Sequence, residues 1–319
     1  MKSPVHLLAA MAPLLFMQHQ VEAASAIKTV IVIAMENTDA KQIYGNTALA
    51  PYINGTLMPI AARASNFNDP LPEKVLSEPH YIRMEAGTNS FFDYTFKDDR
   101  EPVPKKCKES PKPCVNSTAS PDHLAAQLKK AGLSWMSYQE SMKSGECPIV
   151  TLFPFAARHN PFVFFQDVSG NPPSKTNRFC IDHHKPYENF FAADLVANQL
   201  ANYVFITPNI CHDMHDNCEK GVHRIRSGDN WLKAELPRII DWVTKNNGAI
   251  FIIWDEGDAT LKLPFFAVGP GVNPGHDSAV AFDHGSLVRS VEEIFGLPIL
   301  PAVAQNNSFA DLFKPGSFP

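Results

Sequence analysis

Acidic and amide side chains follow three apolar segments of this 319-residue sequence, each at the point where the segment ends. Glu36-Asn37 follows the first segment, Asn209 and the His- and Asp-rich stretch 212–216 follow the second, and Asp255-Glu256 follows the third. Asp and Asn also cap helices, but capping does not account for acidic or amide pairs at two ends and histidines at another. Hard oxygen ligands with histidines nearby suit a divalent cation. The sequence therefore predicts a divalent-metal site, whose ion would help to deprotonate a hydroxyl nucleophile.

Ser77 is the candidate for that hydroxyl. Pro79 follows two residues later, and proline fits the first turn of a helix, so we expect Ser77 near a helix N-terminus. Backbone N–H groups and the helix dipole favour phosphate binding at such an end. The alternative is that Ser77 only caps the helix.

The apolar segments that end in these residues are typical of central strands in a parallel sheet, because they are apolar on both faces. They cover residues 27–35, 202–207 and 249–254. Amphipathic helical patterns cover residues 121–131, 190–201, 231–246 and 286–296. Alternating strands and helices predict an α/β fold with a doubly wound, mostly parallel sheet and helices on both faces. Ligands bind outside the carboxyl ends of the strands of such sheets, where the polar clusters lie.

The composition is that of an ordinary globular protein, with 45% hydrophobic and 19% charged residues. A formal net charge of −5 gives no electrostatic reason to expect nucleic acid as a partner. Beyond the N-terminus no segment approaches the ~18 apolar residues of a membrane span, so we expect no stable membrane insertion. We expect one catalytic domain over residues 27–319, with the Pro-, Lys- and Cys-rich segment 97–120 as a loop excursion or cap.

The N-terminus has the features of an export signal. Lys2 precedes the apolar run Leu7 to Met17, and Ala24-Ser25-Ala26 provides a small-residue cleavage site. The alternative is a first core helix, but Pro13 interrupts the run. We therefore expect a cleaved signal peptide over residues 1–26 and a secreted or periplasmic protein.

The six cysteines fit an exported protein, since an even number in such a chain favours disulfides. Cys107 with Cys114 and Cys211 with Cys218 would each close a short loop, which leaves Cys147 for Cys180. A cysteine-rich metal site is the alternative, although the sequence has no C-x2-C pair.

Five segments resemble, in the same order, the phosphoesterase family of the alkaline phosphatase superfamily, which includes bacterial acid phosphatases, phospholipases C and fungal acid phosphatases. They are Met35-Glu36-Asn37; Ser77-x-Pro79-x-Tyr81 with Ala86-Gly87; Arg158-His159-Asn160-Pro161-Phe162; Pro208-Asn209 with Asp213-Met214-His215-Asp216; and Trp254-Asp255-Glu256-Gly257-Asp258, followed by residues 284–287 and 294–298. Together they span roughly residues 28–298, which is essentially the whole chain after the expected signal.

The resemblance implies a role for each matching position. The implied metal ligands are Glu36, Asn37, Asp255, Glu256 and the nucleophile Ser77. Val75-Leu76 stands where family members often have His-Pro. Glu256 stands where related enzymes carry Asp or His, and a carboxylate there makes the site harder and disfavours zinc. The superfamily's second metal uses an Asp and a His four residues later, but four residues after Asp213 comes Asn217, so we expect a single metal.

Three histidines in the matching segments are expected to act on the phosphate. Protonated His159, His215 and His284 would clamp phosphate oxygens or protonate the leaving alkoxide, and Asp213 completes the expected catalytic group. Histidine acids work in mildly acidic solution, which favours an acid phosphatase. For each histidine, a hydrogen-bonded structural role is the alternative.

The resulting hypothesis is a secreted, metal-dependent phosphomonoesterase that acts on a small phosphorylated substrate through a phosphoserine intermediate. A phospholipase C-type phosphodiesterase ranks second, because the chain is short and shows no membrane-binding amphipathic segment. A non-catalytic exported protein that binds phosphate or metal ranks third. A sulfatase is disfavoured, since those relatives use a modified Cys or Ser in a motif that is absent around Ser77.

Overall fold

The computed structural model describes residues 27–72, 74–103 and 116–319. The expected signal peptide, the cysteines Cys107 and Cys114, and the middle of the expected excursion at 97–120 lie outside these residues.

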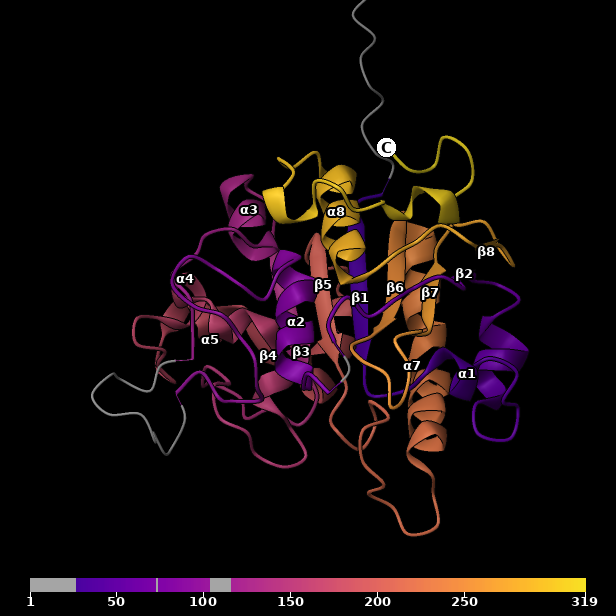
Figure 1. The fold of residues 1–319 in the computed structure, drawn as a ribbon, viewed down its shortest axis with the longest axis horizontal. Helices are drawn as coiled ribbons and strands as arrows, with labels where there is room; N and C mark the ends of the chain where they lie inside the picture. The colour runs from indigo at the N-terminus through magenta and orange to yellow at the C-terminus, as the bar shows by residue number, and fades with distance from the viewer. Residues whose placement is uncertain (1–26, 73, 104–115) are drawn as a thin grey trace, which may run out of the picture.

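An eight-stranded sheet runs through the centre of the protein in the order β4-β3-β5-β1-β6-β7-β2-β8 (Figure 1). The strands are β1 Thr29–Met35, β2 Ala62–Ala64, β3 Trp135–Gln139, β4 His184–Pro186, β5 Tyr203–Thr207, β6 Gly248–Trp254, β7 Phe265–Val268 and β8 Asp277–Ser278. Strand β7 is antiparallel to both of its neighbours, and the other adjacent pairs of this sheet are parallel. The expected mostly parallel α/β sheet is therefore confirmed.

The central strands β1 and β6 are buried over their whole length. Their β-branched and aromatic residues suit a strand that is covered on both faces. The two strands are parallel, with Met35 paired to Trp254 at their carboxyl ends. This register places the residues that follow the two strands, Glu36 after β1 and Asp255 after β6, side by side.

Helices cover both faces of the sheet. They are α1 Ala40–Ile43, α2 Ser77–Ala86, α3 Leu124–Lys130, α4 Gln166–Ser169, α5 Arg178–Asp182, α6 Ala192–Val196, α7 Arg224–Asn246 and α8 His284–Phe295. Helices α2 and α8 pack against each other on the face turned toward the viewer in Figure 1, and the long α7 lies behind the sheet. No helix in the described part of the chain is long and apolar enough to cross a membrane.

The helices expected from the sequence are present, with different bounds. The one expected at 231–246 begins seven residues earlier, at Arg224, and includes both Gly228 and Pro237. Glycine weakens a helix, but at Gly228 a Cβ atom would lie 2.3 Å from Cγ of Met214, so close packing requires glycine there.

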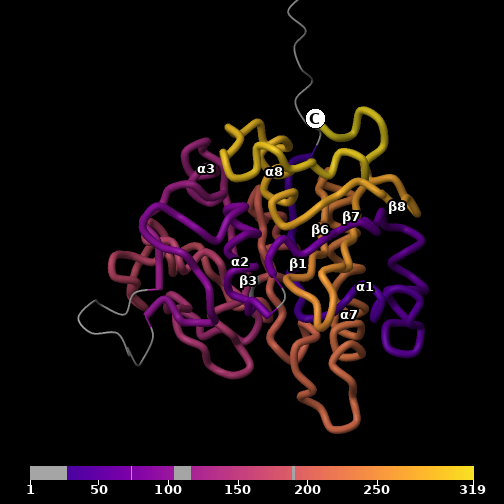
Figure 2. The backbone as a smooth tube through the Cα atoms, viewed as in Figure 1, coloured from indigo at the N-terminus to yellow at the C-terminus, as the bar shows by residue number. Residues whose placement is uncertain are grey.

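Segments far apart in the sequence meet around β1. The smooth trace in Figure 2 shows the indigo N-terminal strand between segments from the middle and the last third of the chain. Strand β1 lies between β5 and β6, so the loops after all three strands lie at the same edge of the sheet.

Candidate active site

The three polar clusters predicted from the sequence meet at the carboxyl edge of the sheet. The backbone N–H of Asn37 donates to Oδ1 of Asp255 at 3.1 Å. The N–H of Glu36 donates to the carbonyl oxygen of Asp213 at 2.8 Å, and the N–H of Asp255 donates to that of Met35 at 3.0 Å. Backbone hydrogen bonds thus fix the loops after β1, β5 and β6 relative to one another.

Ser77 is the first residue of α2, and its side chain points at the acidic cluster. Its Oγ lies 3.1 Å from Oε2 of Glu36 and 3.1 Å from Oε1 of Glu256. Leu76 occupies the cap position of the helix, so the hydroxyl does not serve as the cap. A hydroxyl carries one proton and can donate to only one of two carboxylates. The second contact therefore requires a protonated carboxyl or a cation between the oxygens.

The expected phosphate-binding N–H groups of α2 are largely absent. The N–H of Glu78 donates to Oδ1 of Asp99 at 2.9 Å, and Pro79 has no N–H. Positive charge for a phosphate must therefore come from side chains or from a cation.

The acidic cluster around Ser77 has the composition of a cation site. Burial raises the pKa of Glu36 and of Glu256 to about 7 in each case, and burial with the charges of these two neighbours raises the pKa of Asp255 well above its usual value. Oδ1 of Asn37 and Oδ2 of Asp255 are buried without a hydrogen-bond partner. Such crowded carboxylate and amide oxygens fit a hard divalent cation, which would satisfy the unpartnered atoms and offset the charge repulsion.

His80 adjoins this cluster, although the sequence analysis gives it no role. One of its ring nitrogens lies within 4.8 Å of ligand oxygens from both Asp255 and Glu256. Its Nε2 is 3.0 Å from Oδ2 of Asp69, and its Nδ1 is 2.9 Å from the carbonyl oxygen of Leu76. Position 80 faces the site because it is one helical turn from Ser77, and that i, i+3 spacing was the available signal.

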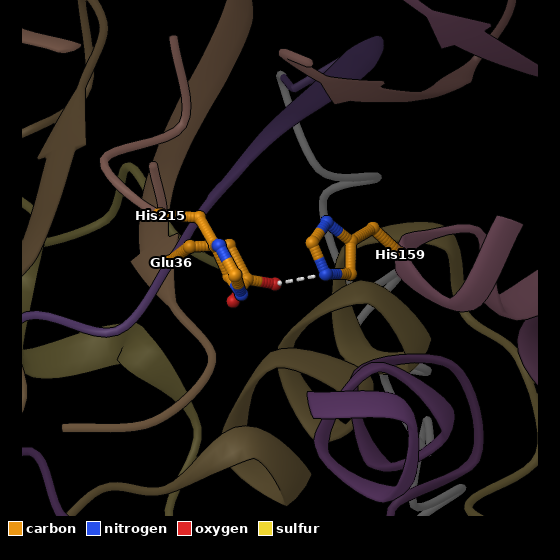
Figure 3. A group of neighbouring side chains, drawn as sticks. All are labelled: Glu36, His159 and His215. Carbon is orange, nitrogen blue, oxygen red and sulfur yellow. Dashed lines mark ion pairs between the residues drawn. The ribbon is translucent and has the colours of Figure 1, made fainter. Parts of the chain in front are cut away.

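Two of the predicted histidines, His159 and His215, lie close to Glu36 (Figure 3). His159 faces Glu36, with its Nε2 3.0 Å from Oε1 of that carboxylate and its Nδ1 3.3 Å from Oδ2 of Asp213. Atoms of Glu36, His159 and His215 all lie within 4.8 Å of one another, so this group could also hold a cation. Burial, then the charge of Arg158, lowers the pKa of His159 well below its usual value. The imidazole is therefore neutral in the metal-free protein.

Arg158 supplies positive charge to this side of the site, and sequence reasoning missed it. Its Nε is 2.9 Å from Oδ2 of Asp99, and its Nη2 is 3.4 Å from Nε2 of His215. Because arginine only donates, Nε2 of His215 acts as the acceptor, which leaves Nδ1–H to donate to Oδ1 of Asp216 at 2.8 Å. Arg158 precedes His159 within one of the matching segments, and that position was the signal that could have identified it.

The third predicted histidine, His284, lies apart from the other two. It is fully buried, and its Nε2 contacts the carbonyl oxygen of Trp254 at 3.0 Å. Burial lowers its pKa to about 4. Its ring packs edge-on against His80, with the ring centroids 5.9 Å apart. His284 thus contacts the backbone just before Asp255 and not the group around His159.

A cavity of about 270 Å³ opens beside the acidic cluster. Its lining includes Asn37 and Glu256 from the site and Lys74, Leu76 and Asp258 from the surrounding loops. A larger cavity of about 510 Å³ is lined by residues such as Glu140 and Trp231 and contains none of the predicted site residues. The smaller cavity is the one that adjoins the acidic cluster around Ser77.

Comparisons with known proteins identify the family of the chain. Residues 76–298 match the phosphoesterase family. The chain is 28% identical over 281 residues to a phosphatidylinositol-3-phosphatase of Mycobacterium tuberculosis, covering 86% of this chain and 80% of that protein. It is 29% identical over 185 residues to a phosphate-repressible acid phosphatase of Penicillium chrysogenum, covering 53% of this chain but only 40% of that protein.

The fold is similar to that of a phosphonate monoester hydrolase from Silicibacter pomeroyi. The TM-score is 0.52 at 12% sequence identity, with 92% of this chain and 78% of that chain covered. The family match spans most of the chain and includes Ser77, Asp255 and Glu256. The chain therefore belongs to the phosphoesterase family and is a phosphoric ester hydrolase.

Proposed function

We propose that this protein is an exported, metal-dependent phosphomonoesterase that forms a phosphoserine intermediate on Ser77. The observation that carries the proposal is the position of the Ser77 hydroxyl, 3.1 Å from carboxylate oxygens of both Glu36 and Glu256. We propose one divalent cation per chain, held by these three side chains with Asn37 and Asp255. Such a cation would supply Lewis acidity that lowers the pKa of the hydroxyl and polarises a phosphoryl oxygen.

The remaining steps use groups of the chain itself and water. The Ser77 proton passes to solvent water, because the two carboxylates within reach of Oγ, Glu36 and Glu256, are proposed ligands of the cation. Oγ then attacks phosphorus, the Ser77–phosphorus bond forms, and the bond to the leaving oxygen breaks. Arg158 neutralises charge on the phosphoryl oxygens. Water next attacks the phosphoserine, which releases phosphate and restores Ser77.

The histidines receive separate roles. His215 is one quarter exposed and its Nδ1 contacts Oδ1 of Asp216, a carboxylate that favours a positively charged ring, so we assign it the transfer of a proton to the leaving alkoxide. His159 and Asp213 hold that side of the site in position, since each is fully buried. We assign His284 a positioning role through the Trp254 carbonyl, because a histidine with a pKa of about 4 carries no proton to donate in mildly acidic solution.

Two disulfides support the proposed export. Cys147 is bonded to Cys180 and Cys211 to Cys218, as the sequence analysis expected. Disulfides persist in oxidising compartments and are rare in the cytosol.

The deciding experiment compares substrates and a nucleophile variant. We expect the wild type to release p-nitrophenol from its phosphate monoester and not from the phosphocholine diester. Ser77→Ala should lower kcat by at least about 1,000-fold, since loss of a covalent nucleophile costs several orders of magnitude. Acid-quenched wild type should carry phosphate on Ser77, as read by peptide mass spectrometry.

The control is Ser90→Ala, which changes an exposed serine outside the site and should leave kcat unchanged. Elemental analysis should find one divalent ion per chain, and chelation should abolish turnover. A Ser77→Ala variant that keeps more than about a tenth of the wild-type kcat would rule out the nucleophile. Full activity after exhaustive chelation would rule out the metal, and efficient diester hydrolysis would favour the phospholipase C-type reaction.

A further inference from the structure

Arg224, the first residue of α7, joins the three loops that form the active site. Its Nη1 lies 2.8 Å from the carbonyl oxygen of Asn37 and also donates to the carbonyl oxygen of Met214. Its Nη2 pairs with Oδ2 of Asp258. These acceptors belong to the loops after β1, β5 and β6, respectively. One guanidinium, with a side chain only 14% exposed, therefore contacts all three.

Two of these acceptors belong to residues with unusual backbone conformations. Asn37 has a φ of 29° and Met214 a φ of 85°, values that cost free energy in a residue with a Cβ atom. Such conformations persist only where the surrounding structure enforces them. The hydrogen bonds from Arg224 to both carbonyl oxygens restrain these turns, in addition to the backbone hydrogen bonds of Asn37 and His215.

Both unusual residues determine where functional groups point. Asn37 is itself one of the proposed metal ligands. Met214 separates Asp213 from His215, and the N–H of His215 donates to Oδ1 of Asp213 at 2.8 Å. A change at either turn would move a ligand oxygen or the proposed proton donor.

Helix α7 provides a second contact for the same loop, one turn after Arg224. The Met214 side chain is fully buried against Gly228, where an added Cβ would lie 2.3 Å from Cγ of Met214 and 3.0 Å from the carbonyl oxygen of His212. The third loop is also held twice, because Gln42 donates to Oδ2 of Asp258 at 3.0 Å. The start of α7 therefore contacts the active-site loops in two ways. The guanidinium of Arg224 binds acceptors in all three loops, and the absence of a side chain at Gly228 leaves room for Met214.

We infer that Arg224 is a positioning residue, which fixes the metal-ligand side of the site relative to the histidine side. The inference rests on the proposed function for the roles of Asn37 and His215, but the loop geometry that it describes does not. A lysine cannot replace this group, because one ammonium does not present the two-pronged donor set that reaches Asn37, Met214 and Asp258 together.

The test uses Arg224→Ala and Arg224→Lys, with Arg226→Ala as the matched control. Arg226 lies two residues further along the same helix and contacts the carbonyl oxygen of Ala48, away from the site. In metal-free protein, we expect amide hydrogen exchange at residues 36–38 and 213–215 to accelerate by about tenfold or more in both Arg224 variants and not in the control. This readout needs neither metal nor substrate, so it separates the inference from the proposed function.

In the full enzyme, both Arg224 variants should bind Mn²⁺ about 10- to 100-fold more weakly by calorimetry, the range expected for loss of a group that orients metal ligands. The kcat should fall more than KM changes, and millimolar guanidinium should partly restore kcat in Arg224→Ala. Gly228→Ala, which displaces Met214 by a separate route, should reproduce the faster exchange at residues 213–215.

Exchange rates, Mn²⁺ affinity and kcat all within twofold of the Arg226→Ala control would overturn the inference. If Arg224→Ala does not fold, Arg224→Lys decides the question by the same three measurements. A wild type that neither binds Mn²⁺ nor hydrolyses a phosphate monoester would instead refute the proposed function. The hydrogen-exchange comparison in metal-free protein would then decide the role of Arg224.

Discussion

Buried acidic groups surround the reactive serine at the scale of single residues. Glu36, Asp213 and Asp255 are fully buried, and burial is the main reason that the pKa of each is raised. A buried carboxylate costs free energy unless it is protonated, hydrogen-bonded or close to a cation. The metal-free site therefore binds protons, and a cation has to compete with them.

This competition predicts a pH dependence of metal binding. Glu36 and Glu256, each with a pKa near 7 in the metal-free protein, are increasingly protonated as the pH falls from 8 to 6. Binding of a cation must release those protons, so we expect affinity to fall by about tenfold per pH unit for each proton released. Calorimetry in buffers of different ionisation enthalpy measures the number of protons. Glu256→Gln should release fewer, and an affinity that does not change between pH 6 and 8 would contradict the prediction.

His215 provides a second prediction at this scale. If it protonates the leaving oxygen, His215→Asn should slow alkyl phosphates by about 100-fold or more, within the range of general acid catalysis. Aryl phosphates leave without a proton and should slow much less. The rate ratio between glycerol phosphate and p-nitrophenyl phosphate measures the difference. Equal slowing of both would indicate that His215 binds phosphate or metal and does not act as the acid.

At the scale of elements, α2 connects the site to the surrounding packing. Its first residue is Ser77, and Tyr81 one turn later stacks on His159 with ring centroids 5.0 Å apart. At the other end Glu85 is buried and contacts His123, which precedes α3. The orientation of the nucleophile therefore depends on contacts along the whole helix.

The contact at the end of α2 predicts a stability change in alkaline solution. Burial alone would lower the pKa of His123, but hydrogen bonds and charge from Asp167 and Glu85 outweigh it and raise the pKa from 6.5 to about 9. A raised pKa means that the contribution to stability is complete below pH 6.5 and is lost as pH rises to 9. By linkage it amounts to roughly 3 kcal/mol at most.

Urea unfolding at pH 6.5 and pH 9 measures this contribution. Wild type should lose more stability over that interval than His123→Gln, which has no titrating group at this position. His276→Gln is the control, because His276 pairs with Asp311 on the surface. Equal losses in wild type and His123→Gln would mean that the buried charge does not stabilise the end of α2.

The elements also show what the sequence could reveal. Strands β1, β5 and β6 were predictable, because each is an unbroken apolar run that ends in polar residues. Strand β3, Trp135–Gln139, mixes polar with apolar residues, and β8 has only two residues, so neither produces a recognisable period. These elements owe their conformation to neighbours in the sheet, which a local pattern does not encode.

The same distinction applies to the site. Glu36 and Asp255 were predictable, because they directly follow strands that pair in parallel. Arg158, His80 and Arg224 were not assigned a role, because each reaches the site only through the way its segment packs on others. The start of α7 at Arg224 was missed for a related reason. Glycine disfavours a helix, and the packing of the Met214 side chain against Gly228, which explains the glycine, is not visible in the local sequence.

At the scale of the whole molecule, the two disulfides act on different parts of the protein. Cys147–Cys180 joins residues 33 positions apart, and both cysteines are buried in the main core. Cys211–Cys218 spans only seven positions, and its loop carries Asp213 and His215. The first therefore restrains the fold, whereas the second restrains a part of the site.

This difference predicts that removing each bond affects stability and kcat to different extents. A disulfide stabilises mainly by limiting the unfolded chain, by roughly 3–4 kcal/mol for a loop the length of Cys147–Cys180 and roughly 2.5 kcal/mol for one the length of Cys211–Cys218. The double variant Cys147→Ala/Cys180→Ala should therefore show the larger fall in the free energy of unfolding, while its folded fraction keeps nearly wild-type kcat. Cys211→Ala/Cys218→Ala should lose less stability but more kcat, because its loop then depends on non-covalent contacts to hold Asp213 and His215. Urea unfolding and steady-state kinetics on both variants at a temperature where each is folded separate the two effects. If the Cys211–Cys218 variant keeps full kcat while the Cys147–Cys180 variant loses it, the histidine side of the site is ordered by the core and not by its own loop.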